Sequence, residues 1–195
     1  MLNVMVDNES VGLKPNSAVA QIGAVIFQDD FTIMDRYCIN LNIDQQLDLG
    51  STYDDGTLDW WMLQEDENSD LYNSVFDNPM NLDGAYKNWS TWLKDNSPVN
   101  DVGFRFWCNH LLFDVPMLNN FMSYYDDNMK HYIKYNNFED FATVRNMAKR
   151  KVSNFKVLEN KINVDANGAS HNALYDAVWQ TKSLELSYKV LDIQL

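Results

Sequence analysis

Residues 17–43, SAVAQIGAVIFQDDFTIMDRYCINLNI, contain two runs that are rich in β-branched and small apolar residues, separated by Asp29 and Asp30. Such runs favour β-strands, and adjacent aspartates between them are typical of a tight turn. Residues 2–7 form a short apolar run that we interpret as a further, buried strand. The three segments together predict a three-stranded meander.

Apolar residues recur at helical spacing in the rest of the chain. This spacing predicts helices over residues 57–67 with Thr57 as N-cap, 82–96 ended by Pro98, 113–125 begun by Asp114 and Pro116, 138–150, and 170–191. Residues 101–109 alternate and predict a strand, and we consider another short strand near residues 131–135. The order of elements implies an α/β fold, a mixed sheet with helices packed on it.

The composition is that of a globular protein, with 195 residues, of which 46% are apolar and 13% aromatic. This length favours one domain over residues 1–195. The sequence has no apolar run of about 18 residues and no pattern of a signal peptide, so we expect a cytoplasmic protein that does not enter membranes. Cys38 and Cys108 are far apart in sequence and are expected to be buried free thiols.

The net charge of −13 argues against long-range attraction to nucleic acid or anionic membranes. Residues 145–161 differ from the rest, because they hold six basic residues and one acidic residue, a charge of +5. Taken alone, this segment is best interpreted as a solvated helix face and loop.

Acidic residues follow the first predicted strand. Asp7 and Glu9 are two residues apart, so both point to one face if the strand extends that far. Two like charges close together repel each other, and a hard divalent cation such as Mg²⁺ or Mn²⁺ would remove the conflict. The alternative is that both carboxylates are simply exposed at a loop. Asp114 by itself is interpreted as an N-cap.

His171 and Asp176 stand five residues apart near the C-terminus, about 140° around a helix. Both can serve one site only if His171 lies on the loop before the helix. Each of these pairs is a weak signal alone. Their order, D-x-E at residues 7–9, N-x4-D from Asn109 to Asp114 and H-x4-D from His171 to Asp176, resembles the DEDDh 3′–5′ exonucleases of the ribonuclease-H-like superfamily.

Two further segments are similar to the branch that holds the T-even phage exonuclease A and the mycobacterial-type exoribonuclease. LDWWMLQ (58–64) carries a W-W-x-x-Q, and FDVPML (113–118) an F-D-x-P-x-L. The spacing of Asp140 and Arg145 matches a D-x-x-R stretch of that branch imperfectly. Asn8 and Ser10 depart from the family pattern, in which hydrophobic and threonine residues are commoner. The resemblance covers nearly the whole chain.

The resemblance implies a meander plus parallel strands, flanked by helices. It also implies two Mg²⁺ or Mn²⁺ ions held by Asp7, Glu9, Asp114 and Asp176, with His171 as general base. The implied substrate-binding residues are Glu9, Trp61, Gln64, Asn109, Lys149, Arg150 and Lys151. Core packing is the alternative for Trp60 and Trp61, and we favour it for at least one of them. Core packing is also favoured for Phe113, and a surface or core position for His110 and His131.

The leading hypothesis is a metal-dependent 3′–5′ exonuclease that acts on single-stranded DNA or RNA 3′ ends and releases nucleoside 5′-monophosphates. An exoribonuclease that trims RNA 3′ ends is the second hypothesis. A non-catalytic module that binds nucleic acid or a polymerase, and a metal-free acidic protein with coincidental motifs, are the others. The relatives suggest a homodimer and a phage origin, which would place the protein in the host cytoplasm.

Overall fold

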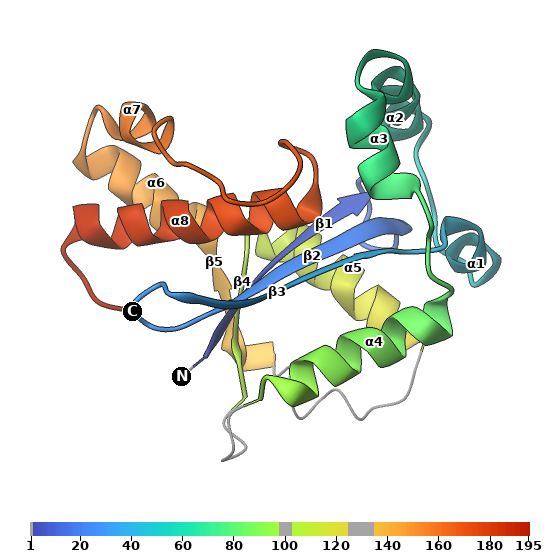
Figure 1. Cartoon of the computed structure of the whole chain (residues 1–195), viewed down its shortest axis with the longest axis horizontal. Coiled ribbons are helices and arrows are strands. Elements are labelled where there is room, and N and C mark those ends of the chain that lie inside the picture. The colour runs from blue at the N-terminus through green and yellow to red at the C-terminus, as the bar shows by residue number, and fades with distance from the viewer. Residues whose placement is uncertain (1, 98–102, 125–134) are drawn as a thin grey trace.

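The computed structural model describes residues 2–97, 103–124 and 135–195 (Figure 1). Its centre is a five-stranded sheet in the order β3-β2-β1-β4-β5. The strands are β1 (Asn3–Ser10), β2 (Val19–Phe27), β3 (Ile33–Asn40), β4 (Arg105–Cys108) and β5 (Phe138–Asp140). β1 pairs antiparallel with β2 and β2 with β3, whereas β4 is parallel to β1 and β5 is parallel to β4. The predicted mixed sheet is therefore confirmed.

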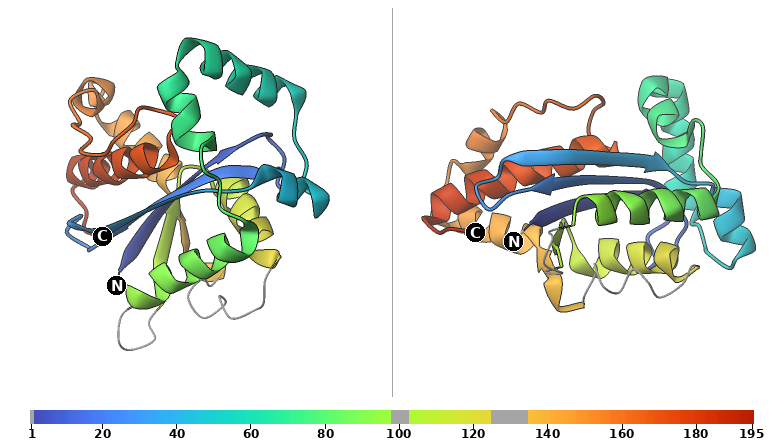
Figure 2. Two further views of the ribbon diagram at one scale, coloured as in Figure 1. Left: turned by 45° about the vertical axis from the view of Figure 1, so that its right-hand side comes forward. Right: turned by 60° about the horizontal axis from the view of Figure 1, so that its bottom comes forward.

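Helices cover both faces of this sheet and one of its ends (Figure 2). α6 (Phe141–Lys151) and α8 (Ala173–Leu191) pack on one face, and α4 (Leu82–Asp95) and α5 (Leu111–Ser123) on the other. The remaining helices are α1 (Ile43–Asp48), α2 (Asp55–Glu67), α3 (Ser69–Phe76) and α7 (Phe155–Glu159), with the 3₁₀ helix η2 at Tyr135–Asn137. α2 and α3 form a third core cluster with Val11, Ala18 and Ala20, beyond the end of β1.

The alternation of side chains along β1 sends successive residues into different cores. Val4 and Val6 pack against α4 and α5, and Met5 packs against α8. β1 stays paired with β2 as far as Ser10, so the face of Met5 continues through Asp7 to Glu9. The expectation that the strand extends to Glu9 is confirmed, and both carboxylates lie on the α8 side.

Four predicted helix starts are wrong, those of α2, α6, α5 and α8, the last of which begins at Ala173 rather than at residue 170. A side-chain cap sets the observed start of α2, α6 and α8, whereas α5 has no side-chain cap. α2 begins at Asp55 because Asp54, not Thr57, is the N-cap, and its side chain accepts a bond from the Thr57 N–H at 2.9 Å. α6 begins at Phe141 rather than at residue 138, because residues 138–140 form β5 and Asp140 caps the helix.

The third boundary is that of α5. It begins at Leu111, and Pro116 lies inside the helix rather than at its start. β4 is shorter than the predicted strand, while residues 101 and 102, like the segment 131–134 considered as a strand, lie outside the described residues. η2 occupies residues 135–137 instead of a strand.

Both cysteines are free, but Cys38 is exposed, so the prediction that it is buried is wrong. Cys38 lies on the edge strand β3, where Tyr37 and Ile39 face the α4 core and the alternate residues are exposed. Cys108, on the more central β4, is buried as predicted. Among the described residues, none of the helices combines the length and apolar character that crossing a bilayer requires.

Candidate active site

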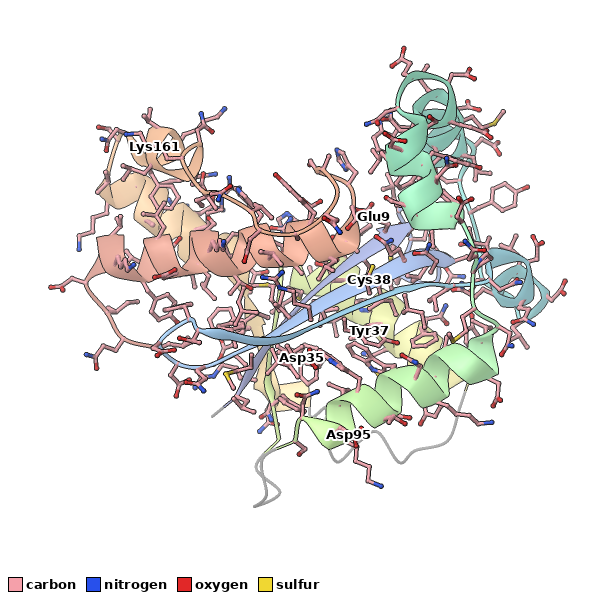
Figure 3. All side chains as sticks on the ribbon, viewed as in Figure 1. Glu9, Asp35, Tyr37, Cys38, Asp95 and Lys161 are labelled. Carbon is pink, nitrogen blue, oxygen red and sulfur yellow. The ribbon has the colours of Figure 1, made fainter. Side chains whose placement is uncertain are left out.

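Three segments that are distant in sequence meet at one end of the sheet and bring four carboxylates together. β1 brings Asp7 and Glu9, the first turn of α5 brings Asp114, and the first turn of α8 brings Asp176. Figure 3 shows Glu9 at the end of β1, beside the start of α8. β1 and β4 are parallel, so their carboxyl ends lie at the same edge, and α5 begins three residues after β4 ends.

All four carboxylates, together with His171 and Asn109, line one cleft of about 530 Å³. Its volume lies within the range of roughly 300–1,000 Å³ that is typical of small-molecule sites. The other lining residues are Asn8, His110, Phe113, Ser170, Tyr175, Trp179 and Gln180.

Hydrogen bonds fix the orientation of three of the carboxylates. The Gln180 side-chain amide donates to Asp7 Oδ1 at 2.6 Å. The backbone N–H of His110, the N-cap of α5, donates to Asp114 Oδ2 at 2.9 Å, so Asp114 lies inside the first turn and the interpretation of Asp114 itself as the N-cap is wrong. The backbone N–H of His171 donates to Asp176 Oδ2 at 2.8 Å and ties the loop before α8 to its first turn.

Burial among like charges raises the pKa of every carboxyl group in the cleft. Burial first, and then the neighbouring carboxylates, raise the pKa of Asp7 well above its ordinary value, and the Gln180 hydrogen bond opposes this shift. Burial, then Asp176 and Asp114, raise the pKa of Glu9 to about 8.

Burial likewise raises the pKa of Asp114 to about 7, against the effect of the backbone N–H groups of His110 and Asn109. Burial also raises the pKa of Asp176, against the His171 backbone N–H. Without a counter-charge, Glu9 and Asp114 therefore bind protons near neutral pH, and a bound cation would favour the ionised forms of the carboxyl groups in the cleft.

His171 lies on the loop before α8, as expected, and its side chain is exposed. Its backbone is left-handed, with φ of 71°, a conformation that few residues other than glycine adopt. Glu9, His171 and Asp176 each offer one ligand atom, and these three atoms lie within 4.8 Å of one another. Such a spacing is suited to holding a metal ion.

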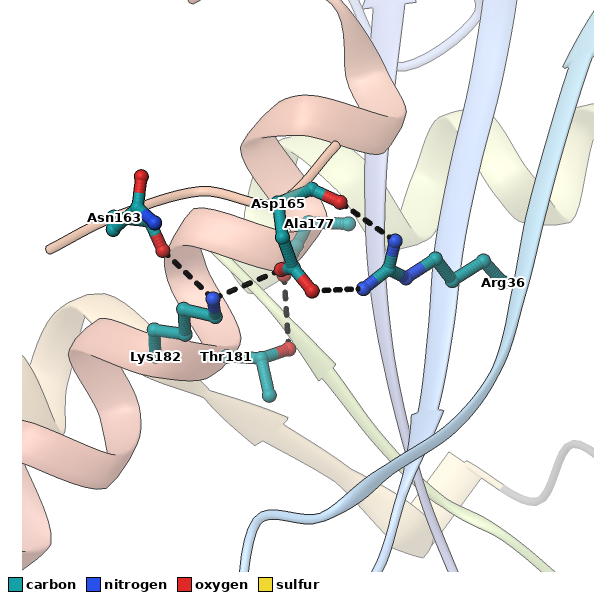
Figure 4. Close-up of polar contacts among 6 residues, drawn as sticks. All are labelled: Arg36, Asn163, Asp165, Ala177, Thr181 and Lys182. Carbon is teal, nitrogen blue, oxygen red and sulfur yellow. Dashed lines mark hydrogen bonds and ion pairs between the residues drawn. The ribbon is translucent and has the colours of Figure 1, made fainter. Parts of the chain in front are cut away.

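The loop that leads to His171 is anchored by ion pairs at Asp165 (Figure 4). Arg36 on β3 donates to Asp165 Oδ2 at 2.8 Å, and Lys182 on α8 donates to Asp165 Oδ1 at 2.9 Å. Hydrogen bonds from these two cations hold the pKa of Asp165 well below its usual range. The loop is thus attached to both the sheet edge and α8.

A second hollow of about 420 Å³ adjoins the cleft and shares Asn8, Glu9, Phe113 and His171 with it. Trp60 and Trp61 both line this hollow, but in different ways. Trp61 is 2% exposed and its indole N–H donates to the Ser10 carbonyl oxygen at 3.0 Å, so it is largely a core residue. Trp60 is more exposed, and its ring meets the His171 ring edge to face at 4.9 Å between centroids.

The structure does not bring all of the predicted substrate-binding residues to this site. Gln64 lies on α2 and lines neither hollow. Lys149, Arg150 and Lys151 occupy the last turn of α6, where Lys151 Nζ donates to the Leu191 carbonyl oxygen at 2.9 Å. Leu191 follows Asp176 by 15 residues, or about 22 Å along α8 at ~1.5 Å per residue, so these cations lie at the far end of that helix.

Phe113 is partly buried against the core and also lines both hollows, so core packing describes it only in part. His110 is exposed at the rim of the cleft, and His131 lies outside the described residues.

Sequence reasoning missed Gln180, Tyr175, Trp179 and the role of Asn8 as a wall of both hollows. For Gln180 a signal existed, because it follows Asp176 by four residues and therefore shares its helix face. Asn8 Oδ1 and Gln180 Oε1 are buried atoms without a hydrogen-bond partner among the described residues, so polar groups of this cleft are left unsatisfied.

The fold resembles that of solved exonucleases. The nuclease domain of 3′hExo, a DEDDh family member, bound to rAMP, has a TM-score of 0.59 at 12% identity, over 98% of this chain and 92% of that chain. The zinc-bound Escherichia coli ExoI–ssDNA complex has a TM-score of 0.60 at 14% identity, and the E. coli exonuclease I complex with a dA16 oligonucleotide has 0.60 at 13%. These two matches cover 98% of this chain but 42% of exonuclease I.

No curated protein matches the sequence. Residues 2–187 match the family described as the 3′–5′ exoribonuclease Rv2179c-like domain. This match shows that the chain belongs to that family of 3′–5′ exonucleases, and its fold is similar to that of the DEDDh nuclease domain of 3′hExo.

Proposed function

We propose that the protein hydrolyses single-stranded nucleic acid from its 3′ end and releases nucleoside 5′-monophosphates, with two Mg²⁺ or Mn²⁺ ions held in the carboxylate cleft. The convergence of Asp7, Glu9, Asp114 and Asp176 in one cleft, with His171 beside them, is the observation that carries this proposal. RNA is the favoured substrate because the family is described as exoribonucleases, while DNA remains the second candidate because the exonuclease I structures contain it.

The donor set fits hard divalent cations. All four side chains present carboxylate oxygen, the ligand type that Mg²⁺ and Mn²⁺ prefer. Burial first, and for Glu9 also the charges of Asp176 and Asp114, raise the pKa values of Glu9 and Asp114, so the ionised carboxylates lack a counter-charge. Bound ions would supply the positive charge that draws the scissile phosphate into an anionic cleft and stabilises the departing oxygen.

In this proposal His171 is the general base. Its ring offers an atom within 4.8 Å of carboxylate oxygens of Glu9 and Asp176, so a water bound beside these carboxylates would lie near the imidazole. A ring nitrogen takes the proton of that water as the new P–O bond forms, and the negative charge of the cleft stabilises the resulting imidazolium. The Asp176 carboxylate holds the backbone N–H of His171 and so keeps the ring at the cleft.

Substrate recognition is assigned to groups around the metal ligands. Glu9 lines both hollows and is placed to meet the terminal ribose 3′-OH, and Asn109 lines the cleft beside Asp114. Aromatic surface for the terminal base comes from Trp60 more than from Trp61, because Trp61 is buried. Gln64 and the cations Lys149, Arg150 and Lys151 would act only through parts of the strand beyond the terminal nucleotide.

The experiment is digestion of 5′-labelled single-stranded RNA and DNA of identical sequence, with Mg²⁺, Mn²⁺ or a chelator. We expect a ladder that shortens from the 3′ end, release of 5′-monophosphates, and no cleavage with the chelator. The ratio of initial rates on RNA and DNA decides the preferred sugar. Binding without cleavage in either metal would instead identify a non-catalytic module that retains the fold.

Three expectations complete the proposal. A homodimer is tested by light scattering at several protein concentrations, and a cytoplasmic location by fractionation of the producing cell. Metal stoichiometry is tested by calorimetric titration with Mn²⁺, for which we expect two sites per chain that are both lost in Asp7→Ala.

A further inference from the structure

Two aromatic residues of α8 line the catalytic cleft without a part in the proposed chemistry. Tyr175 and Trp179 are four residues apart, so they lie on the same face of the helix, and both are partly buried. Trp60 lines only the adjoining hollow, whereas Tyr175 and Trp179 line only the cleft with the four carboxylates. Aromatic side chains therefore line both hollows that share Glu9.

Arg145 and Phe141 pack against the Trp179 ring, which also lines the cleft. The guanidinium carbon of Arg145 lies 5.0 Å from the ring centroid, and the Phe141 ring meets Trp179 edge to face at 6.2 Å. Arg145 is itself fixed by a two-pronged ion pair with Glu159, at 2.5 and 2.9 Å. Glu159 is 3% exposed and also accepts a bond from Ser183 Oγ at 2.7 Å.

This arrangement gives Arg145 a structural function. Its Nε and Nη2 donate to both oxygens of a buried carboxylate, and this ion pair fixes the guanidinium against the protein rather than along a phosphate backbone. A cation against one face of an indole also limits the movement of the ring. The result is a rigid aromatic platform, the feature on which bases stack in proteins that bind single strands.

Charge indicates the direction in which the rest of the strand leaves. Residues 37–86, which include α1, α2 and α3, contain eleven acidic residues and no Lys, Arg or His. A polyanion is repelled from that side of the site over a Debye length of about 8–10 Å. The basic segment 145–161 lies on α6, α7 and their connections, behind Trp179, and Figure 3 shows Lys161 at the opposite end of α8 from Glu9.

We propose that Tyr175 and Trp179 form the stacking site for the penultimate nucleotide, on the 5′ side of the scissile phosphate, and that the strand leaves toward α6. This inference rests on the proposed exonuclease function. The terminal nucleotide then lies on the Trp60 side, and the phosphate between the two nucleosides lies over the carboxylates. The enzyme therefore recognises the base that follows the one it removes.

The test compares three oligonucleotides in single-turnover cleavage of the first bond: an intact strand, one with an abasic penultimate residue, and one with an abasic terminal residue. Loss of stacking on one base corresponds to about 5- to 150-fold in binding. We expect wild type to show a KM higher by such a factor for the penultimate abasic strand, with kcat changed less. Trp179→Leu should raise KM on the intact strand and no longer distinguish it from the penultimate abasic strand.

The controls separate this inference from the proposed function. Trp179→Leu should still discriminate against the terminal abasic strand, and Trp179→Phe should keep part of the penultimate effect. Trp92→Leu, a change to a partly buried tryptophan on α4 away from the cleft, should behave as wild type. Active wild type that cleaves intact and penultimate abasic strands alike would overturn the stacking site alone. Absence of any cleavage by wild type would overturn the exonuclease proposal itself.

Discussion

Gly23 on β2 is the position where the smallest possible change should disable the enzyme. It pairs with Asp7 across the sheet, and α8 passes directly over it. A Cβ at residue 23 would lie 2.1 Å from the carbonyl carbon of Ala173 and 2.2 Å from the amide nitrogen of Leu174. These are backbone atoms, which cannot rotate away as a side chain can.

The displacement required by Gly23→Ala follows from these distances. Ordinary contact begins near 3.4 Å, so the first turn of α8 must move by about 3.4 − 2.1 = 1.3 Å. That turn carries Asp176 and adjoins His171, whereas Asp7 and Glu9 remain on β1. A misplacement of about 1 Å can cost ~100-fold in rate, and overpacking costs roughly 1–3 kcal/mol of stability. We therefore expect a folded protein with about 1% of wild-type kcat.

The assay is the initial rate on a 5′-labelled strand at saturating Mg²⁺, with the folded fraction measured by circular dichroism. Leu93→Ala is the matched control, since it opens a cavity in the α4 core at a cost of about 2–5 kcal/mol and lies far from the cleft. The folded fraction of this control should remain fully active. Wild-type rates in folded Gly23→Ala, or a loss that merely follows its unfolded fraction, would refute the reasoning.

Three further predictions concern charge. Asp7→Ala and Asp176→Ala should each reduce cleavage by more than the ~10–100-fold typical of outer-shell changes while leaving the fold intact, because each removes a proposed ligand and relieves repulsion; full activity in either variant, measured with the same labelled strand, contradicts the assignment. Without metal, the melting temperature should fall as pH rises from about 5 to 8. The reason is that Glu9 and Asp114, with pKa values of about 8 and about 7, bind protons in the folded state that the unfolded chain has lost. Mg²⁺ should therefore raise the melting temperature more at pH 8 than at pH 5.5, and equal shifts would argue against carboxylate ligation. Reversing the charges of Lys149, Arg150 and Lys151 should weaken the binding of strands long enough to reach the far end of α8 and flatten the salt dependence of that binding. The binding of a dinucleotide should not change. Unchanged affinity for long strands, measured by fluorescence anisotropy, would mean that this turn is solvated surface.

Local patterns identified most of the long elements and the shared face of Asp7 and Glu9. Runs of apolar and β-branched residues over β1, β2 and β3 are a property of neighbouring residues, so they can be recognised without knowing the fold. The 140° between residues five apart on a helix indicated that His171 can share a site with Asp176 only from the loop before the helix, although the predicted helix 170–191 included His171; the structure begins α8 at Ala173. Short elements were missed, because α1, α3 and α7 span too few residues for a periodic pattern, and β5 was absorbed into the helix that follows it.

The sequence by itself determined which residue types are available and which face of its own strand or helix each one occupies. Only the tertiary structure decided that parallel pairing of β1 and β4 carries Asp114 to the end of β1, that Trp61 rather than Trp60 is the buried tryptophan, and that Gly23 admits the backbone of α8. It also decided that the most basic turn lies about 22 Å from Asp176, at the other end of α8. The physical reason is that periodicity depends on bonded neighbours, whereas convergence depends on strand order and helix docking, which no short segment encodes.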